Sequence, residues 1–167
     1  MATQKTQGYQ ALNILTSDNA NIPYPALLKA GQTNAVAAPV LNTMEDAIGG
    51  FETTNKVYAG DIVYFSVAAE AATVIKVISD TELLLNSNSG KAANQDYVIY
   101  QASSYMNLQD ANNGCVLYIG TSGDLTVDTI AGSENVLFKS VPVGFFPVQV
   151  KKVYNTGTSA KDIVALW

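Results

Sequence analysis

The sequence predicts an all-β protein, and three observations support that prediction. Short apolar runs recur along residues 56–101 and 114–167, with Gly, Ser, Asn and Asp between them. These runs are rich in Val, Ile, Tyr and Phe, and their spacing suits strands joined by tight turns. The stretch AAEAA at 68–72 has high helix propensity, but it is too short to hold a helix by itself.

The same patterns divide the chain into four parts. These are an extended N-terminal arm (1–55), a small β module (56–101), a linker (102–113) and a C-terminal β module (114–167). Tightly joined short strands predict a small SH3-like barrel for the middle module. Hairpin spacing predicts a β-sandwich or a jelly-roll-like fold for the C-terminal module.

The arm shows no clear periodicity, and two interpretations remain open. It is either a flexible tail with a linker or a segment that becomes ordered against neighbouring subunits. We favour the docked arm, because disordered segments are usually poorer in apolar residues. The candidate interface residues in the arm are Ile14, Ile22, Tyr24, Leu27 and Leu28. Residues 26–30 and 43–48 are each compatible with a short helix.

In the middle module we expect strands at 62–67, 73–78, 82–86 and 97–100, with a tight turn at Ser79–Thr81. Asp61 follows Gly60 just before the first of these strands. A carboxylate in that position fixes a turn by accepting hydrogen bonds from nearby backbone amides, and we expect this role rather than catalysis.

In the C-terminal module we expect strands at 115–119, 124–129, 135–141, 148–154 and 162–167. The segment PVGFFP, at 142–147, should interrupt the ladder and turn a corner. Either both phenylalanines, Phe145 and Phe146, are buried, or one points outward as a candidate contact. Trp167 either caps its own core or fills a pocket on a neighbour.

Composition limits the classes of partner. Charged residues make up 14% of the chain, against roughly 25% in typical soluble domains. The net charge is −5, and all nine basic residues are lysines, so direct nucleic-acid binding is not expected. No window approaches 18 apolar residues, and the N-terminus has no apolar signal core, so we expect neither a membrane span nor secretion.

The residues also argue against catalysis and metal binding. There is no histidine, and the single cysteine, Cys115, has apolar neighbours that predict a buried thiol. Asp124 and Asp128 share a face of one predicted strand, but about 13 Å of strand rise separates them, too far to chelate one ion. Gly-rich phosphate loops are absent. We therefore expect no enzyme activity and no cofactor.

Several segments resemble small virion structural proteins of tailed bacteriophages. In the C-terminal module these are LYIGTSGDLTV (117–127) and VPVGFFPVQVKKVYNTGTSAKDIVALW (141–167). They are also similar to the head-spike base proteins of phage-derived gene transfer agents. NANIPYP (19–25), followed later by GDIVY (60–64), looks like marine-phage structural proteins.

The resemblance implies a protein that decorates or cements a capsid as a homo-oligomer. Its partners would be the major capsid protein and possible fibre or spike proteins. It would be assembled in the host cytoplasm and reside on the capsid surface. Two alternatives remain open: a vertex spike base or tail/fibre adaptor, and a host-surface or carbohydrate-binding module. The second would use aromatic side chains, with Tyr97, Tyr100, Tyr105 and Phe145 as candidates.

Overall fold

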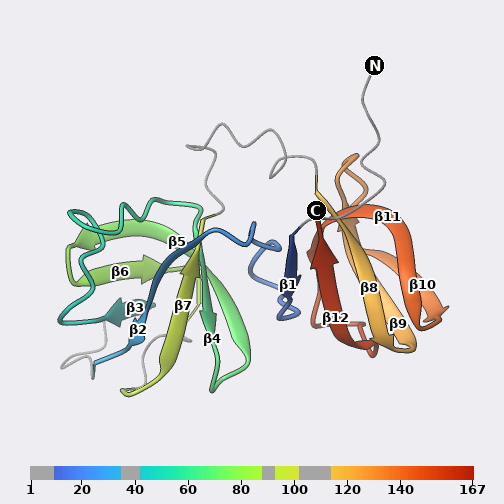
Figure 1. The fold of residues 1–167 in the computed structure, drawn as a ribbon, viewed down its shortest axis with the longest axis horizontal. Helices are drawn as coiled ribbons and strands as arrows, with labels where there is room; N and C mark the ends of the chain where they lie inside the picture. Colours follow the sequence, from blue (N-terminus) through green and yellow to red (C-terminus); the bar gives the residue numbers. More distant parts are fainter. Residues whose placement is uncertain (1–9, 35–41, 88–92, 102–113) are drawn as a thin grey trace. The chain divides into compact units, whose positions relative to one another are not determined.

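The computed structural model describes residues 10–34, 42–87, 93–101 and 114–167. In these residues it contains twelve β-strands and no helix, so the predicted all-β class is confirmed. Within the same residues, no helix is present that could cross a membrane. The strands form two antiparallel six-stranded sheets (Figure 1).

The chain divides into two compact units, which we describe separately. Of the described residues, those at 15–34, 42–87 and 93–101 form one unit, here called the barrel unit. Those at 10–14 and 114–167 form the other, here called the C-terminal unit. The N-terminal third is therefore shared between the units instead of forming an arm of its own, and the expected boundary at residue 55 lies inside the barrel unit.

The barrel unit is a strongly curled sheet, a half-barrel whose two edge strands are linked at one end. Its strands, in spatial order, are β2 (Leu27–Gln32), β7 (Asp96–Tyr100), β4 (Ile62–Phe65), β5 (Glu70–Ser79), β6 (Glu82–Leu85) and β3 (Thr43–Glu45). Just past the end of β2, the Asn34 amide donates a hydrogen bond of 2.8 Å to the carbonyl of Glu45 at the end of β3. The Asn34 side chain in turn accepts a hydrogen bond from the Ala47 amide. These bonds join the edge strands, as expected for a small barrel.

The interior of this barrel is apolar. The buried cluster contains Met44, Phe51, Val57, Val63, Phe65, Ala72, Val74, Leu83, Leu85, Tyr97 and Ile99. Met44 and Phe51 come from the segment predicted to be an arm, and both are fully buried. The N-terminal third therefore completes the barrel core, because the four predicted strands of the middle module leave two edges that β2 and β3 cover.

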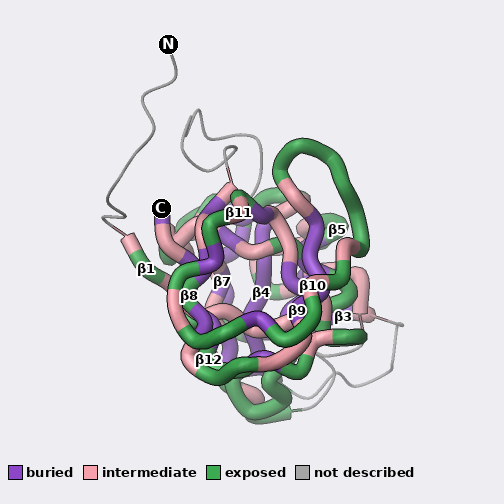
Figure 2. Tube along the Cα trace, turned by 90° about the vertical axis from the view of Figure 1, so that its right-hand side faces the viewer, coloured by how far each residue is buried: buried purple, intermediate pink, exposed green. Residues whose placement is uncertain are grey.

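The C-terminal unit is built on a single sheet. Its strands, in spatial order, are β1 (Ala11–Asn13), β12 (Lys161–Leu166), β8 (Cys115–Thr121), β11 (Gly144–Val153), β9 (Gly123–Thr129) and β10 (Val136–Val141). The long strand β11 pairs with β8 through its first half and with β9 through its last residues. Figure 2 shows this unit with its buried residues in purple.

This sheet curls around its buried face. Phe138 of β10 and Phe146 of β11 pack edge to face with ring centroids 4.9 Å apart, although β9 lies between their strands in the sheet. Residues on opposite sides of a middle strand can meet in this way only if the sheet bends. The five strands expected for a sandwich thus form one curved sheet, with β1 added at an edge.

Three local expectations differ from the structure. The short helices considered at 26–30 and 43–48 are wrong, because β2 and β3 occupy those positions as edge strands of the barrel. Between the strands expected at 62–67 and 73–78, residues Glu70–Ala72 of the AAEAA stretch already belong to β5. Pro147 lies within β11, at a shift of register between Phe146 and Val150, so it does not end the strand. Proline is tolerated there because the ladder is already interrupted.

Candidate interaction surface

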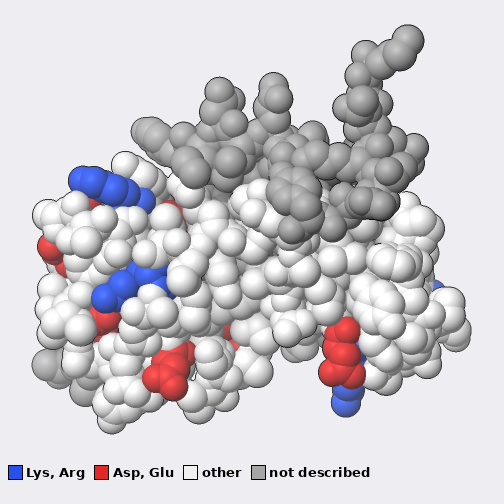
Figure 3. All heavy atoms as spheres, viewed as in Figure 1, with Lys and Arg blue, Asp and Glu red and all other residues white. Residues whose placement is uncertain are grey.

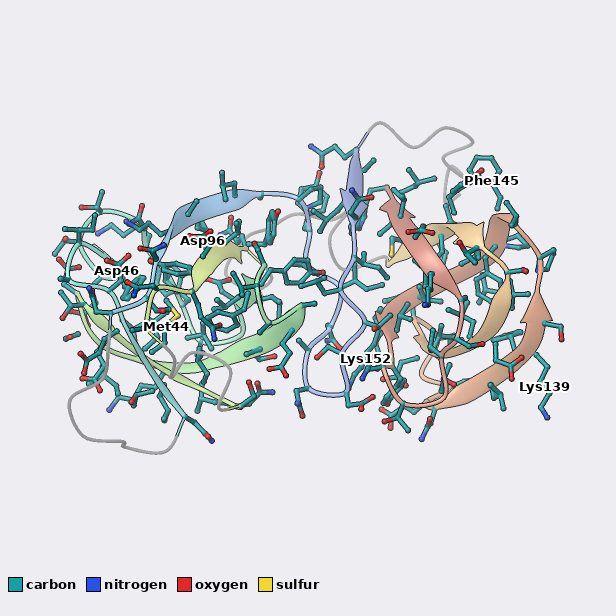
Figure 4. The ribbon with its side chains drawn as sticks, turned by 90° about the horizontal axis from the view of Figure 1, so that it is seen from below. Met44, Asp46, Asp96, Lys139, Phe145 and Lys152 are labelled. Atoms are coloured by element: carbon teal, nitrogen blue, oxygen red, sulfur yellow. The ribbon has the colours of Figure 1, made fainter. Side chains whose placement is uncertain are left out.

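The most exposed aromatic side chain among the described residues is Phe145, near the start of β11. It is 74% exposed, whereas its neighbour Phe146 is 6% exposed and lies in the core. Successive residues of a strand point to opposite faces, so the backbone itself fixes this division. Of the two alternatives left open by the sequence, the structure has the one in which a single phenylalanine faces outward. Figure 4 shows Phe145 at the periphery of the sheet.

Phe145 is held in place by a neighbouring ring. Its cross-strand partner is Tyr118 of β8, and the two rings pack edge to face with centroids 5.6 Å apart. Tyr118 is itself 38% exposed. An edge-to-face pair of this kind limits the freedom of both side chains before any partner binds.

The apolar surface continues across the sheet from this pair. Direct cross-strand partners share a face, so Phe145, Tyr118 and Val164 lie in one row, which ends at the polar Asn13 of β1. Leu166 and Val116 form the next row, with Ala11 of β1 beyond them. None of these residues is charged. We call the six residues other than Asn13 the outer apolar face.

The opposite face of the same strands is also apolar. Leu117, Ile119 and Ala165 are fully buried in the core. An antiparallel sheet with one face in water normally alternates apolar and polar residues. Strands β8 and β12 lack that alternation, and strands apolar on both sides are typical of sheets covered on both sides. Figure 3 shows how few charged side chains the molecule presents on one side.

The other candidate interface residues lie against their own chain. The Leu28 side chain packs on the barrel core. The Ile14 amide donates to the Ile163 carbonyl at 3.1 Å, and the Trp167 amide donates to the Gln10 carbonyl at 3.1 Å. Trp167 is 8% exposed. Ile22 and Tyr24 are half-buried, so Leu27 is the only one of the five arm residues that is largely exposed.

The aromatic residues proposed for carbohydrate binding differ in their exposure. Tyr97 is buried at 1% exposure. Tyr100 packs edge to face on Tyr64, with ring centroids 5.3 Å apart. Tyr105 lies outside the described residues. Of the four candidates, Phe145 alone is described as largely exposed.

The barrel unit contains a buried polar cluster of Asp46, Tyr97 and Lys29 that the sequence analysis did not predict. The carboxylate of Asp46, 2% exposed, accepts hydrogen bonds from the Tyr97 hydroxyl and from the Ile48 amide. The Lys29 ammonium lies 3.8 Å from the same carboxylate and donates to the Ile48 carbonyl at 3.0 Å. Burial, together with the hydrogen bond to Asp46, raises the pKa of Tyr97 far above its usual range. The cluster fastens the 46–48 turn to β2 and β7.

Glycine makes room for this cluster at position 31. A Cβ atom there would lie 2.7 Å from both the Asp46 carboxylate and the Tyr97 hydroxyl. No sequence signal linked these residues, because they are far apart in the chain and belong to three different segments. The groups are those of proton-transfer sites, but they are packed against one another and fasten the turn.

The other acidic residues named in the sequence analysis accept hydrogen bonds from backbone amides. Asp61 accepts a hydrogen bond of 2.8 Å from the Tyr58 amide, which confirms its predicted role in a turn. Asp124 and Asp128 accept bonds from the amides of Ser140 and Asn135, respectively. Within the described ranges, no group of three metal-ligating side chains is present.

No family model matches the chain. Comparisons with curated proteins and with solved structures likewise found no significant match.

Proposed function

We propose that this chain is a structural protein of a tailed-phage particle that attaches to its neighbours through the outer apolar face. The observation that carries the proposal is Phe145, an exposed aromatic side chain that packs on Tyr118, beside the stretch of β8 and β12 that has apolar residues on both faces. The resemblance of residues 117–127 and 141–167 to phage virion proteins supports it. The low charged content also suits lateral packing against other proteins.

The mode of attachment differs from a docked arm. The described part of the N-terminal third already pairs within its own chain, through β1, β2 and β3. Attachment through the C-terminal sheet needs no such segment to be released. Aromatic side chains at the centre of a contact commonly carry much of its binding energy, and Phe145 with Tyr118 would form that centre. Repetition around a symmetric shell adds avidity to each weak contact.

The test uses particles purified from the strain that encodes this sequence. Mass spectrometry of the particles should detect the chain, and a reconstructed map should place the outer apolar face against another virion protein. A shell-wide cement would be present in hundreds of copies, a vertex protein in about sixty or fewer, and a tail ring in six or twelve. Particles that lack the chain would overturn the proposal.

A matched pair of variants tests the surface itself. Phe145→Ser removes the exposed ring, and Leu137→Ser removes an apolar side chain that is 48% exposed on β10. Particle binding should weaken by at least tenfold for the first variant, in the range of interface hot spots. It should change little for the second. Equal losses for both would show that general surface hydrophobicity, and not the outer apolar face, drives attachment.

A further inference from the structure

The barrel unit carries an open hollow that the proposed attachment does not use. It has a volume of about 400 Å³ and lies between the 52–59 loop and β5. That volume falls within the range of small-molecule sites. The lining residues are Glu52, Lys56, Val57, Tyr58, Ala59, Ile75, Lys76 and Val77.

Hydrogen bonds hold the wall of the hollow in place. The Asp80 carboxylate accepts bonds of 2.9 Å from the amides of Glu52 and Thr53, and a third bond of 2.8 Å from the Thr53 hydroxyl. These hydrogen bonds, the backbone bond from Thr53 first, lower the pKa of Asp80, so the carboxylate stays ionised. At the other end, the Tyr58 amide donates to Asp61. The loop is therefore fixed at both ends, and the hollow exists before any ligand enters.

The interior of the hollow is apolar. Val57 is 3% exposed, while Ile75 and Tyr58 remain 50% and 38% exposed. Ile75 lies where the register of β5 against β6 shifts between Val74 and Lys76. A bulge of this kind changes the direction of a side chain, and such features are common next to binding sites. The exposed Ile75 and the Tyr58 ring give a planar or branched hydrocarbon two surfaces to contact.

The charges of the hollow differ in sign from those of the whole chain. Two of its lining residues are lysines, Lys56 and Lys76, and one is an acid, Glu52. These three residues together carry one net positive charge, whereas the chain carries a net charge of −5. The ionised Asp80 behind the 52–53 segment interacts with Lys56, so Lys76 is the ammonium of the lining that we assign to an anionic ligand. An ammonium is a compact charge that attracts a carboxylate without fixing its orientation.

We propose that this hollow binds a small carboxylate with an aromatic or branched apolar body. The body would rest on Ile75, Val57 and the Tyr58 ring, and the carboxylate would lie toward Lys76. The inference does not rest on the proposed virion function, because the outer apolar face belongs to the other unit. Either proposal can fail without the other.

The test is a titration of the isotope-labelled full-length protein with 4-phenylbutyrate. Changes in the amide chemical shifts, measured by NMR, report binding. Saturable shifts should gather at 52–59 and 75–77, with a dissociation constant in the millimolar range. The neutral analogue 4-phenylbutan-1-ol should bind about three- to fivefold more weakly, as expected for a partly exposed ion pair. Shifts that do not saturate, that gather elsewhere, or that are equal for the alcohol would overturn the proposal.

Four single variants sharpen the result. Lys76→Gln should weaken phenylbutyrate binding about two- to fivefold, and Glu52→Gln should strengthen it by a similar factor. Ile75→Asp should abolish binding, and because Ile75 is half-exposed this variant should still fold. Lys139→Gln, on β10 of the other unit, is the matched charge control and should change nothing. If it weakens binding as much as Lys76→Gln does, net charge alone explains the effect and the site is refuted.

Discussion

At the scale of single residues, several aspartates of this protein act as acceptors for backbone amides. Asp61, Asp80, Asp124 and Asp128 each accept at least one such bond. A short carboxylate beside a turn can satisfy amides that no strand neighbour reaches. The few charges of this chain are thus used within the fold, which explains why the acidic residues found in the sequence did not assemble into a site.

The buried pair of Tyr97 and Asp46 gives a prediction about pH. Tyr97→Phe removes the hydroxyl that donates to the Asp46 carboxylate, and should lower the free energy of unfolding by about 1–3 kcal/mol at pH 7. Because the pKa of Tyr97 is raised in the folded state, the wild type holds this proton above pH 10 while the unfolded chain releases it. The wild type therefore loses stability as the pH rises past 10. The difference between the two proteins should shrink there, as measured by urea unfolding from pH 7 to 11; a constant difference would contradict this account.

Cys115 supports a second prediction at this scale. The thiol is 2% exposed, and burial raises its pKa to about 12, so at pH 8 it is both protonated and covered. Only the thiolate attacks thiol reagents at a useful rate. The folded protein should therefore react with a disulfide reagent at least a hundredfold more slowly than the urea-unfolded protein. Comparable rates in both states would show that the C-terminal sheet opens readily at β8.

At the scale of secondary-structure elements, the β9–β10 hairpin depends on one buried carboxylate. Asp128, 5% exposed, accepts a hydrogen bond of 2.8 Å from the amide of Asn135, which has a positive φ of 56°. Asp128→Ala would leave that amide without its acceptor and should cost about 1–3 kcal/mol. Fluorescence of Trp167, the one tryptophan of the chain, during urea unfolding would follow the loss.

Asp96→Ala is the matched control for this prediction. Asp96 is exposed and lies in the barrel unit, where its carboxylate accepts a hydrogen bond from the Gln32 side chain of the neighbouring strand β2. Surface contacts of this kind contribute little, so the Trp167 transition should move by less than about 0.5 kcal/mol. If the two variants behaved alike, the hairpin would not depend on Asp128.

The strands that could be predicted from the sequence are those with their own apolar pattern. All nine strands expected in the two modules are present, at 62–65 through 161–166, with ends that differ by a few residues. β1, β2 and β3 carry no such pattern, because each is a sheet edge whose partners lie far away in sequence, as in the pairing of Ala11 with Leu166. Local residues do not encode a pairing of that range.

The candidate sites also divide into features that the local sequence predicts and features that depend on contacts between distant segments. The opposite exposure of Phe145 and Phe146 follows from their adjacency, so the sequence could offer it as an alternative. The Asp46–Tyr97–Lys29 cluster and the hollow beside Ile75 depend on how segments meet in three dimensions. The residue spacing within any one segment therefore predicts neither the polar cluster nor the hollow.

At the scale of the whole molecule, the two units share one N-terminal segment. β1 pairs with β12 in the C-terminal unit, whereas β2 and β3 complete the barrel. An arm that only docks on neighbouring subunits could be deleted without unfolding either module. The structure leads to the opposite expectation, because that deletion removes one strand from one sheet and two from the other. It also removes Met44 from the barrel core and Asp46 from the polar cluster.

Deleting residues 1–50 should therefore unfold the barrel and weaken the C-terminal unit. Loss of a buried methionine alone costs about 2–5 kcal/mol, which is comparable with the whole stability of a small domain. Far-UV circular dichroism should show a large loss of β signal, and Trp167 fluorescence should show a lower melting temperature for the C-terminal unit.

Deleting residues 1–9, which end before β1, is the control and should leave both signals unchanged. If the 51–167 fragment kept the full β signal and melted cooperatively, the N-terminal third would be a dispensable arm after all. Loss of particle binding by that fragment would then report attachment rather than unfolding.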